Sequence, residues 1–148
     1  MSVYLIVAYQ TAGGRPLREA IERVMGRDAG AEFRLLVPAT RPQHLFTWTE
    51  GESIALAEAT AEMAAEWLSS FGVDLTAVTV GDPDPMIAVS DELGAHPECS
   101  EIIISTFPPG VSRWLRLDLP SRLQKATGLP ITHVVVHPES ASIFPGQE

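Results

Sequence analysis

Short, unbroken apolar runs alternate with helical patterns along this chain from one end to the other. The apolar runs, such as Ile102-Ile103-Ile104, do not alternate with polar residues. This is typical of parallel strands that helices cover on both faces. The pattern therefore predicts an α/β fold, a three-layer αβα sandwich around a five-stranded parallel sheet. The predicted strands are Val3–Tyr9, Phe33–Pro38, Leu75–Val80, Glu101–Thr106 and Ile131–His137.

Four helices are predicted between these strands, each with its own start and stop signals. Their approximate extents are Pro16–Met25, Glu52–Phe71, Asp84–Gly94 and Leu119–Thr127. In the second helix, apolar residues recur at steps of three and four and predict a buried stripe. The stripe comprises Ile54, Ala57, Ala61, Ala64, Leu68 and Phe71, and the glutamates Glu58, Glu62 and Glu66 line a solvated outer face.

Length and charge limit the classes of protein that this chain can represent. Its 148 residues suit one domain, expected over residues 1–138 with a tail at 139–148. A net charge of -9 argues against nucleic acid and anionic membranes as partners, because both would be repelled. No apolar run is long enough to span a membrane, Met1–Tyr9 lacks signal-peptide features, and Cys99 is the single cysteine. We therefore expect a cytoplasmic protein without a disulfide.

The few basic residues are unevenly placed. Between Arg41 and Arg113 the chain has no lysine or arginine at all. Arg113, Arg116, Arg122 and Lys125 then follow within a short stretch. This stretch begins in one of two long predicted loops, Phe107–Asp118, which follows the fourth strand. Ligands of open parallel sheets bind beyond the carboxyl ends of the strands, so we expect any small anionic ligand there.

Three passages resemble the universal stress proteins. They are Arg34-Leu35-Leu36-Val37-Pro38, Val80-Gly81-Asp82-Pro83, and the segment from Ser112-Arg113-Trp114-Leu115 to Arg122-Leu123. The resemblance extends from Val3 to Val136 and implies the strand order 3-2-1-4-5. It also implies a homodimer through the edge strand 131–137, where Thr132, Val134 and Val136 form an apolar face.

The phosphate-binding pattern of the ATP-binding members of that family is not intact here. Those members follow strand four with Gly, two residues, Gly, about nine residues, then Gly-Ser or Gly-Thr, which bring backbone N–H groups close to the phosphates. In the matching stretch, Ser105–Leu119, Gly110 is the one remaining glycine, Pro108 and Pro109 precede it, and Asp118 stands near the final position. A carboxylate there would repel a phosphate. At the end of strand one, Tyr9-Gln10-Thr11 occupies the place of the family's nucleotide-binding aspartate.

A candidate nucleotide or anion site can still be defined at this edge of the predicted sheet. Arginine offers fixed, fork-like donors to phosphate and could replace the missing glycines. The resemblance implies that Val37 would present its backbone to an adenine. The candidate residues are Ala8, Tyr9, Val37, Thr106, Gly110, Ser112, Arg113 and Arg116.

The first functional hypothesis is a non-enzymatic stress-response domain that binds no cofactor and does not bind ATP in the usual way. One alternative is an ATP- or AMP-binding universal stress protein that uses the loop 105–122. A second is a flavodoxin-like electron carrier, because Gln10–Arg15 is a Thr/Gly-containing loop after strand one. No Gly-x-Ser-x-Gly, His-x-Gly-His or Ser-Gly-Gly-x-Asp-Ser string supports an enzyme. His96 and Cys99 are too few ligands for a predicted metal site.

Overall fold

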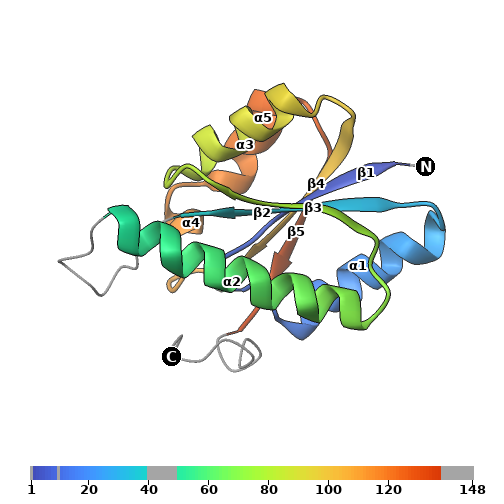
Figure 1. Ribbon diagram of the computed structural model, residues 1–148. Coiled ribbons are helices and arrows are strands. Elements are labelled where there is room, and N and C mark those ends of the chain that lie inside the picture. The colour runs from blue at the N-terminus through green and yellow to red at the C-terminus, as the bar shows by residue number, and fades with distance from the viewer. Residues whose placement is uncertain (1, 10, 40–49, 138–148) are drawn as a thin grey trace.

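The computed structural model describes residues 2–9, 11–39 and 50–137 of the chain, and Figure 1 shows their arrangement. Strands and helices alternate in the predicted order, with one additional short helix. The strands are β1 (Val3–Val7), β2 (Glu32–Pro38), β3 (Leu75–Gly81), β4 (Cys99–Thr106) and β5 (Ile131–Val135). The helices are α1 (Arg15–Arg27), α2 (Glu50–Ser70), α3 (Pro85–Ala95), α4 (Arg113–Arg116) and α5 (Leu119–Thr127).

All five strands form one parallel sheet in the order β3-β2-β1-β4-β5, as predicted. Flavodoxin-like sheets have the order 2-1-3-4-5. The alternative of a flavodoxin-like electron carrier is therefore wrong at the level of the fold.

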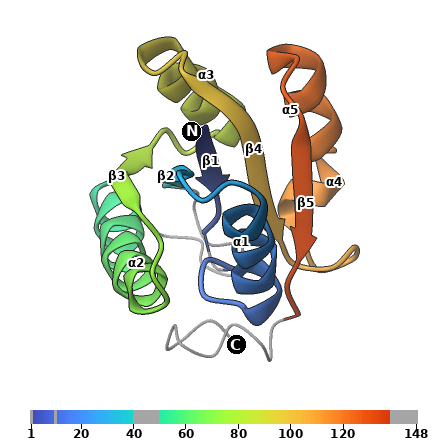
Figure 2. The same ribbon diagram turned by 90° about the vertical axis from the view of Figure 1, so that its right-hand side faces the viewer.

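Helices cover both faces of the sheet. Helices α1 and α2 lie on one face, and α3 and α5 lie on the other, as both views show (Figures 1 and 2). Between these layers, Leu5 pairs with Ile102, Ile6 with Ile103 and Val7 with Ile104. All six side chains are fully buried. The unbroken apolar runs of the sequence are thus the two central strands of the sheet.

The predicted helix boundaries have a visible structural basis. The Asp84 side chain accepts a hydrogen bond from the N–H of Met86 at 2.9 Å, so Asp84 is the N-cap of α3. Gly128 ends α5 with φ of 70°, a left-handed conformation that favours glycine. These two signals were predicted to within about one residue of the observed ends.

The predicted buried stripe of α2 needs one correction. Ala57, Ala61, Ala64 and Leu68 are buried, but Ile54 is 38% exposed. The buried face instead includes Ser53 and Thr60, which lie four residues before Ala57 and four before Ala64. The helix is rotated toward these two small polar residues, which a count of apolar residues ignores. Glu58, Glu62 and Glu66 are exposed.

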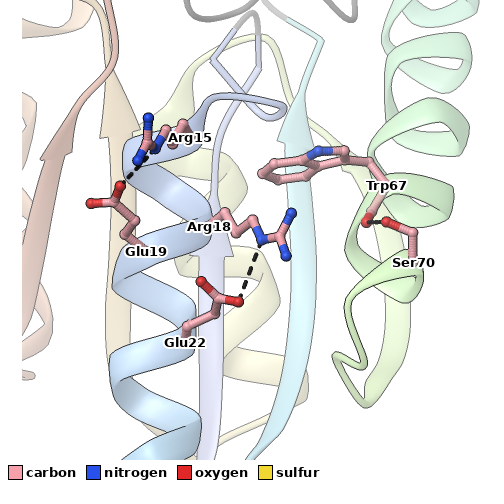
Figure 3. A network of polar contacts seen from close by, with 6 residues as sticks. All are labelled: Arg15, Arg18, Glu19, Glu22, Trp67 and Ser70. Atoms are coloured by element: carbon pink, nitrogen blue, oxygen red, sulfur yellow. Dashed lines mark hydrogen bonds and ion pairs between the residues drawn. The ribbon is translucent and has the colours of Figure 1, made fainter.

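At the surface, Arg18 of α1 and Trp67 of α2 extend toward each other (Figure 3). The Arg18 guanidinium lies 4.7 Å from the centre of the Phe71 ring, and Trp67 meets Phe71 edge-on at 5.0 Å. Arg18 also pairs with Glu22 one helical turn along α1. The cation–π contact links α1 to the residue that follows α2 and contributes about 0.5–1 kcal/mol at such an exposed site.

The edge strand β5 presents a different face from the expected one. Val134 is 6% exposed and Val136 is fully buried, so both belong to the chain's own core. The prediction that Thr132, Val134 and Val136 form an apolar face for a dimer is therefore wrong for the two valines, whereas Thr132 is half-buried. The physical reason is that α1 and α5 both pack against β5, so even an edge strand has covered faces. His133 and His137 are the exposed residues of this segment.

Candidate functional site

The candidate site lies at the carboxyl edge of the sheet, where the ends of β1, β2 and β4 are neighbours. The N–H of Ala8 donates to the carbonyl of Leu36 at 3.2 Å, which extends the pairing of β1 with β2 as far as Val37. On the other side, β1 pairs with β4, which ends at Thr106. After β1 the chain continues to α1 and then to β2 on one side of β1. After β4 it continues through α4 and α5 to β5 on the other side, so the strand order reverses between β1 and β4. This is the ligand-binding position of open parallel sheets.

Four of the candidate residues are buried at the carboxyl ends of β1, β2 and β4, and we call them the floor of the site. Ala8 and Val37 have no exposed surface, Thr106 is 2% exposed and Tyr9 is 7% exposed. The structure therefore brings these four residues, from three strands, to one place. None of the four has a charged side chain.

Thr11 and Ser105 close the floor by bonding to each other's backbone. Thr11 Oγ1 donates to the Ser105 carbonyl at 2.9 Å, and Ser105 Oγ donates to the Thr11 carbonyl at 3.3 Å. Each hydroxyl has one proton to donate. Neither proton is therefore available to a phosphate.

The hydroxyl of Thr106 also forms hydrogen bonds within the chain. Its Oγ1 donates to the carbonyl of Phe107 at 2.9 Å and lies 2.8 Å from His133 Nε2. Which of the two atoms donates in the Thr106–His133 hydrogen bond depends on the tautomer of the imidazole. Burial lowers the pKa of His133. The sequence did not indicate this pair, although the register of β4 with β5 produces it.

Tyr9 carries an unusual hydroxyl. Its oxygen is buried and has no hydrogen-bond partner among the described residues. Burial raises the pKa of Tyr9 to about 12. The ring is therefore a neutral phenol at physiological pH, and its hydroxyl is the one unengaged donor at the floor of the described site.

The loop after β4 is tightly folded. The Pro108 carbonyl accepts hydrogen bonds from Val111 N at 3.1 Å and from Ser112 N at 2.9 Å. Gly110, between them, has φ of 90°, which a residue with a side chain would rarely adopt. Ser112 Oγ accepts from Leu115 N at 3.1 Å and caps α4. The sequence predicted an irregular loop here, and the Ser112 capping signal for a short helix was missed.

The arginines of the site lie on the outer side of this loop. Arg113 and Arg116 are exposed on α4, and Arg122 donates from Nη1 to the Leu117 carbonyl at 3.4 Å. Trp114 is 8% exposed and packs into the core. Gly110, Ser112, Arg113 and Arg116 are thus in one loop, with the two arginines on its surface.

Two other features weigh against phosphate binding at this edge. Asp118 is exposed and adopts a left-handed conformation with φ of 53°. It directly precedes α5 and makes no side-chain cap for that helix. At the end of the β1 loop, a Cβ on Gly14 would lie 2.3 Å from Val136 Cγ1. Gly14 is thus explained by close packing, and a phosphate is not needed to account for it.

The other chemistry-bearing residues lie elsewhere. His96 Nδ1 is 3.2 Å from Glu98 Oε2 at the surface, and Cys99 is buried, which raises the pKa of its thiol. Over residues 2–9, 11–39 and 50–137, no three His, Cys, Asp or Glu residues gather as metal ligands. A hollow of about 340 Å³ lies at the opposite, amino edge of the sheet. It is lined by Met25, Ala29, Gly30, Ala31, Glu32, Gly72 and Asp74, and its carboxylates do not suit an anion.

Comparison with solved structures identifies the fold. The structure of a universal stress protein from Archaeoglobus fulgidus is similar over 90% of this chain and 94% of that one, with a TM-score of 0.56. The fold is that of a universal stress protein. The sequences are 15% identical, so the likeness is one of fold. No protein-family model matches the chain, and no curated protein matches it in sequence. Within the described residues, no helix is long and apolar enough to cross a membrane.

Proposed function

We propose that this protein is a non-enzymatic, cytoplasmic stress-response domain of the universal stress protein type that does not bind ATP through a phosphate loop. Its fold, shared with a universal stress protein, supports the stress-related role. The observation that carries the proposal is the state of the hydroxyls at the carboxyl edge. Thr11, Ser105 and Thr106 each donate their one proton to a backbone carbonyl of the chain itself.

A phosphate at this edge would have to displace bonds that already exist. Breaking one leaves a buried carbonyl without its partner, at a cost of about 1–3 kcal/mol. The loop that follows offers one positive-φ glycine, Gly110, where the ATP-binding pattern has several. The proline pair before it also removes two backbone N–H donors.

Nucleotide titration tests this part of the proposal. A ligand present at a thousand times its dissociation constant stabilises a protein by about 4 kcal/mol. We expect the melting temperature to stay constant as ATP with magnesium, or AMP, is raised to millimolar concentration. A saturable rise with either nucleotide would overturn it.

The proposal includes a homodimer through the edge strand 131–137. β5 pairs with β4 on one side, so its other edge has backbone groups that a second copy can bind. Ile131 and Val135 are half-buried and supply apolar contact on the strand itself. With Val134 and Val136 in the core, the backbone edge would contribute more of the interface than the side chains.

Light scattering after size exclusion tests the dimer. We expect twice the chain mass of 16.0 kDa, and a monomer for Val135→Lys, because a lysine on an edge strand opposes strand addition. Val78→Lys is the matched control, since Val78 is 42% exposed on the other edge strand, β3. A 16.0 kDa species for the unmodified chain would overturn this part.

A second candidate is a nucleotide- or phosphate-binding module that uses the loop 105–122. The exposed arginines on α4, beside Gly110, favour it. Inorganic phosphate should then raise the melting temperature, and Arg113→Gln should abolish the effect. A response to AMP but not to phosphate would place recognition on the base, at the buried floor.

A further inference from the structure

The loop after β4 exposes apolar and cationic side chains together. Leu117 is 52% exposed and Val111 is 50% exposed. These are the largest exposures of bulky apolar side chains in the described part of the chain. Arg113, Arg116 and Arg122 are also exposed. We call Leu117 and these three arginines the arginine–leucine patch.

Helix geometry places the centre of this patch on one face. Arg113 is three residues before Arg116 and four before Leu117, so their side chains are neighbours on the helix surface. Trp114, three residues before Leu117, is buried and faces the core. The Arg122 guanidinium is held at the Leu117 carbonyl, 3.4 Å away, which adds a third positive charge beside the leucine.

The patch is presented by a preorganised segment. The N–H of Leu117 donates to the carbonyls of Arg113 and Trp114, and Asp118 N donates to Leu115 O at 3.0 Å. The buried Trp114 and Leu119 anchor the segment to the core on either side of Leu117. Leu117 is thus held in solvent by a fixed backbone, and binding there would require little loss of conformational freedom.

Charge separates this patch from the other exposed apolar residues. Ile54, Leu56 and Met63 are exposed on α2, a helix with glutamates and no lysine or arginine. Between Arg113 and Arg122 the charged residues in the sequence are three arginines and one aspartate, Asp118. In a protein of net charge -9, this positive and apolar surface is complementary to a negative and apolar one.

We infer that the arginine–leucine patch docks an acidic, amphipathic segment of a partner protein, with the partner's apolar side chain on Leu117 and its carboxylates on the arginines. Arginine binds carboxylates with two parallel hydrogen bonds, which adds geometric specificity. A partner protein is favoured over an anionic membrane because the rest of this acidic molecule would be repelled by a lipid surface of the same sign. The inference is independent of nucleotide binding and of the proposed dimer.

Fluorescence anisotropy with defined peptides tests the inference. The probe is a labelled helical peptide of glutamate and leucine, and its counterparts replace either the glutamates by glutamines or the leucines by serines. We expect saturable, salt-sensitive binding of the glutamate–leucine peptide, and binding weakened at least about fivefold for each counterpart. If the glutamate–serine peptide bound as tightly as the glutamate–leucine peptide, the patch would be a simple anion site and the proposal would be overturned.

Matched variants locate the binding. Leu117→Ser and Arg116→Glu should each weaken binding at least about fivefold, as should Arg122→Glu, which remains informative if the α4 variant fails to fold. Ile54→Ser and Arg23→Glu, exposed residues outside the patch, should leave binding unchanged. Loss of binding in the controls alone would overturn the proposed location. Binding to phosphatidylserine vesicles as tight as to the peptide would overturn the choice of a protein partner.

Discussion

Thr11 and Ser105, 94 residues apart in sequence, each donate a side-chain hydrogen bond to the other's backbone carbonyl. The first bond is 2.9 Å long and the second 3.3 Å, and both lie in the buried interior. This reciprocal pair fastens the segment after β1 to the end of β4. It stabilises the carboxyl edge of the sheet with the same hydroxyls that a phosphate site would use.

The reciprocal pair should contribute measurably to stability. Ser105→Ala and Thr11→Val each remove one bond and leave a buried carbonyl without that donor, so each should lower the free energy of unfolding by about 1–3 kcal/mol. Urea denaturation measures the change, and the double variant should deviate from additivity by more than about 0.5 kcal/mol. Ser100→Ala, which removes an exposed bond to the Val3 carbonyl, is the control and should cost less. Equal costs for Ser100→Ala and Ser105→Ala would contradict the expectation.

Much of the fold was predictable because the buried residues of the central strands are consecutive in the sequence. Ile102, Ile103 and Ile104 are all fully buried, so the apolar run alone marks a central strand. Asp84 and Gly128 mark helix ends through local chemistry that does not depend on distant contacts. The strand order itself came from the family resemblance, because periodicity does not specify which strands are neighbours.

The site was less predictable because its bonds join residues that are distant in sequence. Thr106 meets His133 only through the register of β4 with β5. The engagement of Thr11 and Ser105 likewise depends on the packing of two chain segments. Val134 and Val136 were misplaced for the same reason, since an alternating strand pattern does not reveal which helices cover it. Local capping at Ser112 was readable and was missed.

The ion pair between Arg34 on β2 and Glu92 on α3 should respond strongly to the loss of one partner. The nitrogen and oxygen atoms are 2.8 Å apart, and the side chains are 12% and 8% exposed. Arg34→Met would leave the carboxylate of Glu92 buried without its charge partner, at a cost of about 3–5 kcal/mol in unfolding free energy. The double variant with Glu92→Met should recover part of that loss.

The exposed pair Arg15–Glu19 provides the control for this ion pair. Its side chains are 84% and 51% exposed (Figure 3). Arg15→Met should therefore change the unfolding free energy by less than about 1 kcal/mol. If chemical denaturation gave similar losses for Arg34→Met and Arg15→Met, the buried pair would have no special structural role.

Gly14 and Gly26 should respond to alanine in opposite directions. A Cβ on Gly14 would overlap Val136, at 2.3 Å from Cγ1, so Gly14→Ala should destabilise the protein by about 1–3 kcal/mol. Gly26 is in α1 with open space at the Cβ position, so Gly26→Ala should stabilise by up to about 1 kcal/mol. Thermal unfolding measures both changes. Val136→Ala should partly rescue Gly14→Ala, and a failure of rescue would place the strain elsewhere.

The partial burial of His133 should make stability depend on pH. Burial lowers the pKa of His133 below its ordinary value of 6.5, so below pH 6.5 the unfolded chain takes up more protons than the folded one. The contribution of His133 is fully present above pH 6.5 and is lost as the pH falls through the folded-state pKa. Because one side of His133 is exposed, the slope should stay well under the limit of about 1.4 kcal/mol per pH unit. The free energy of unfolding, measured by urea denaturation, should depend less on pH below 6.5 in His133→Gln than in His137→Gln. An equal slope in both variants would assign the pH dependence to another group.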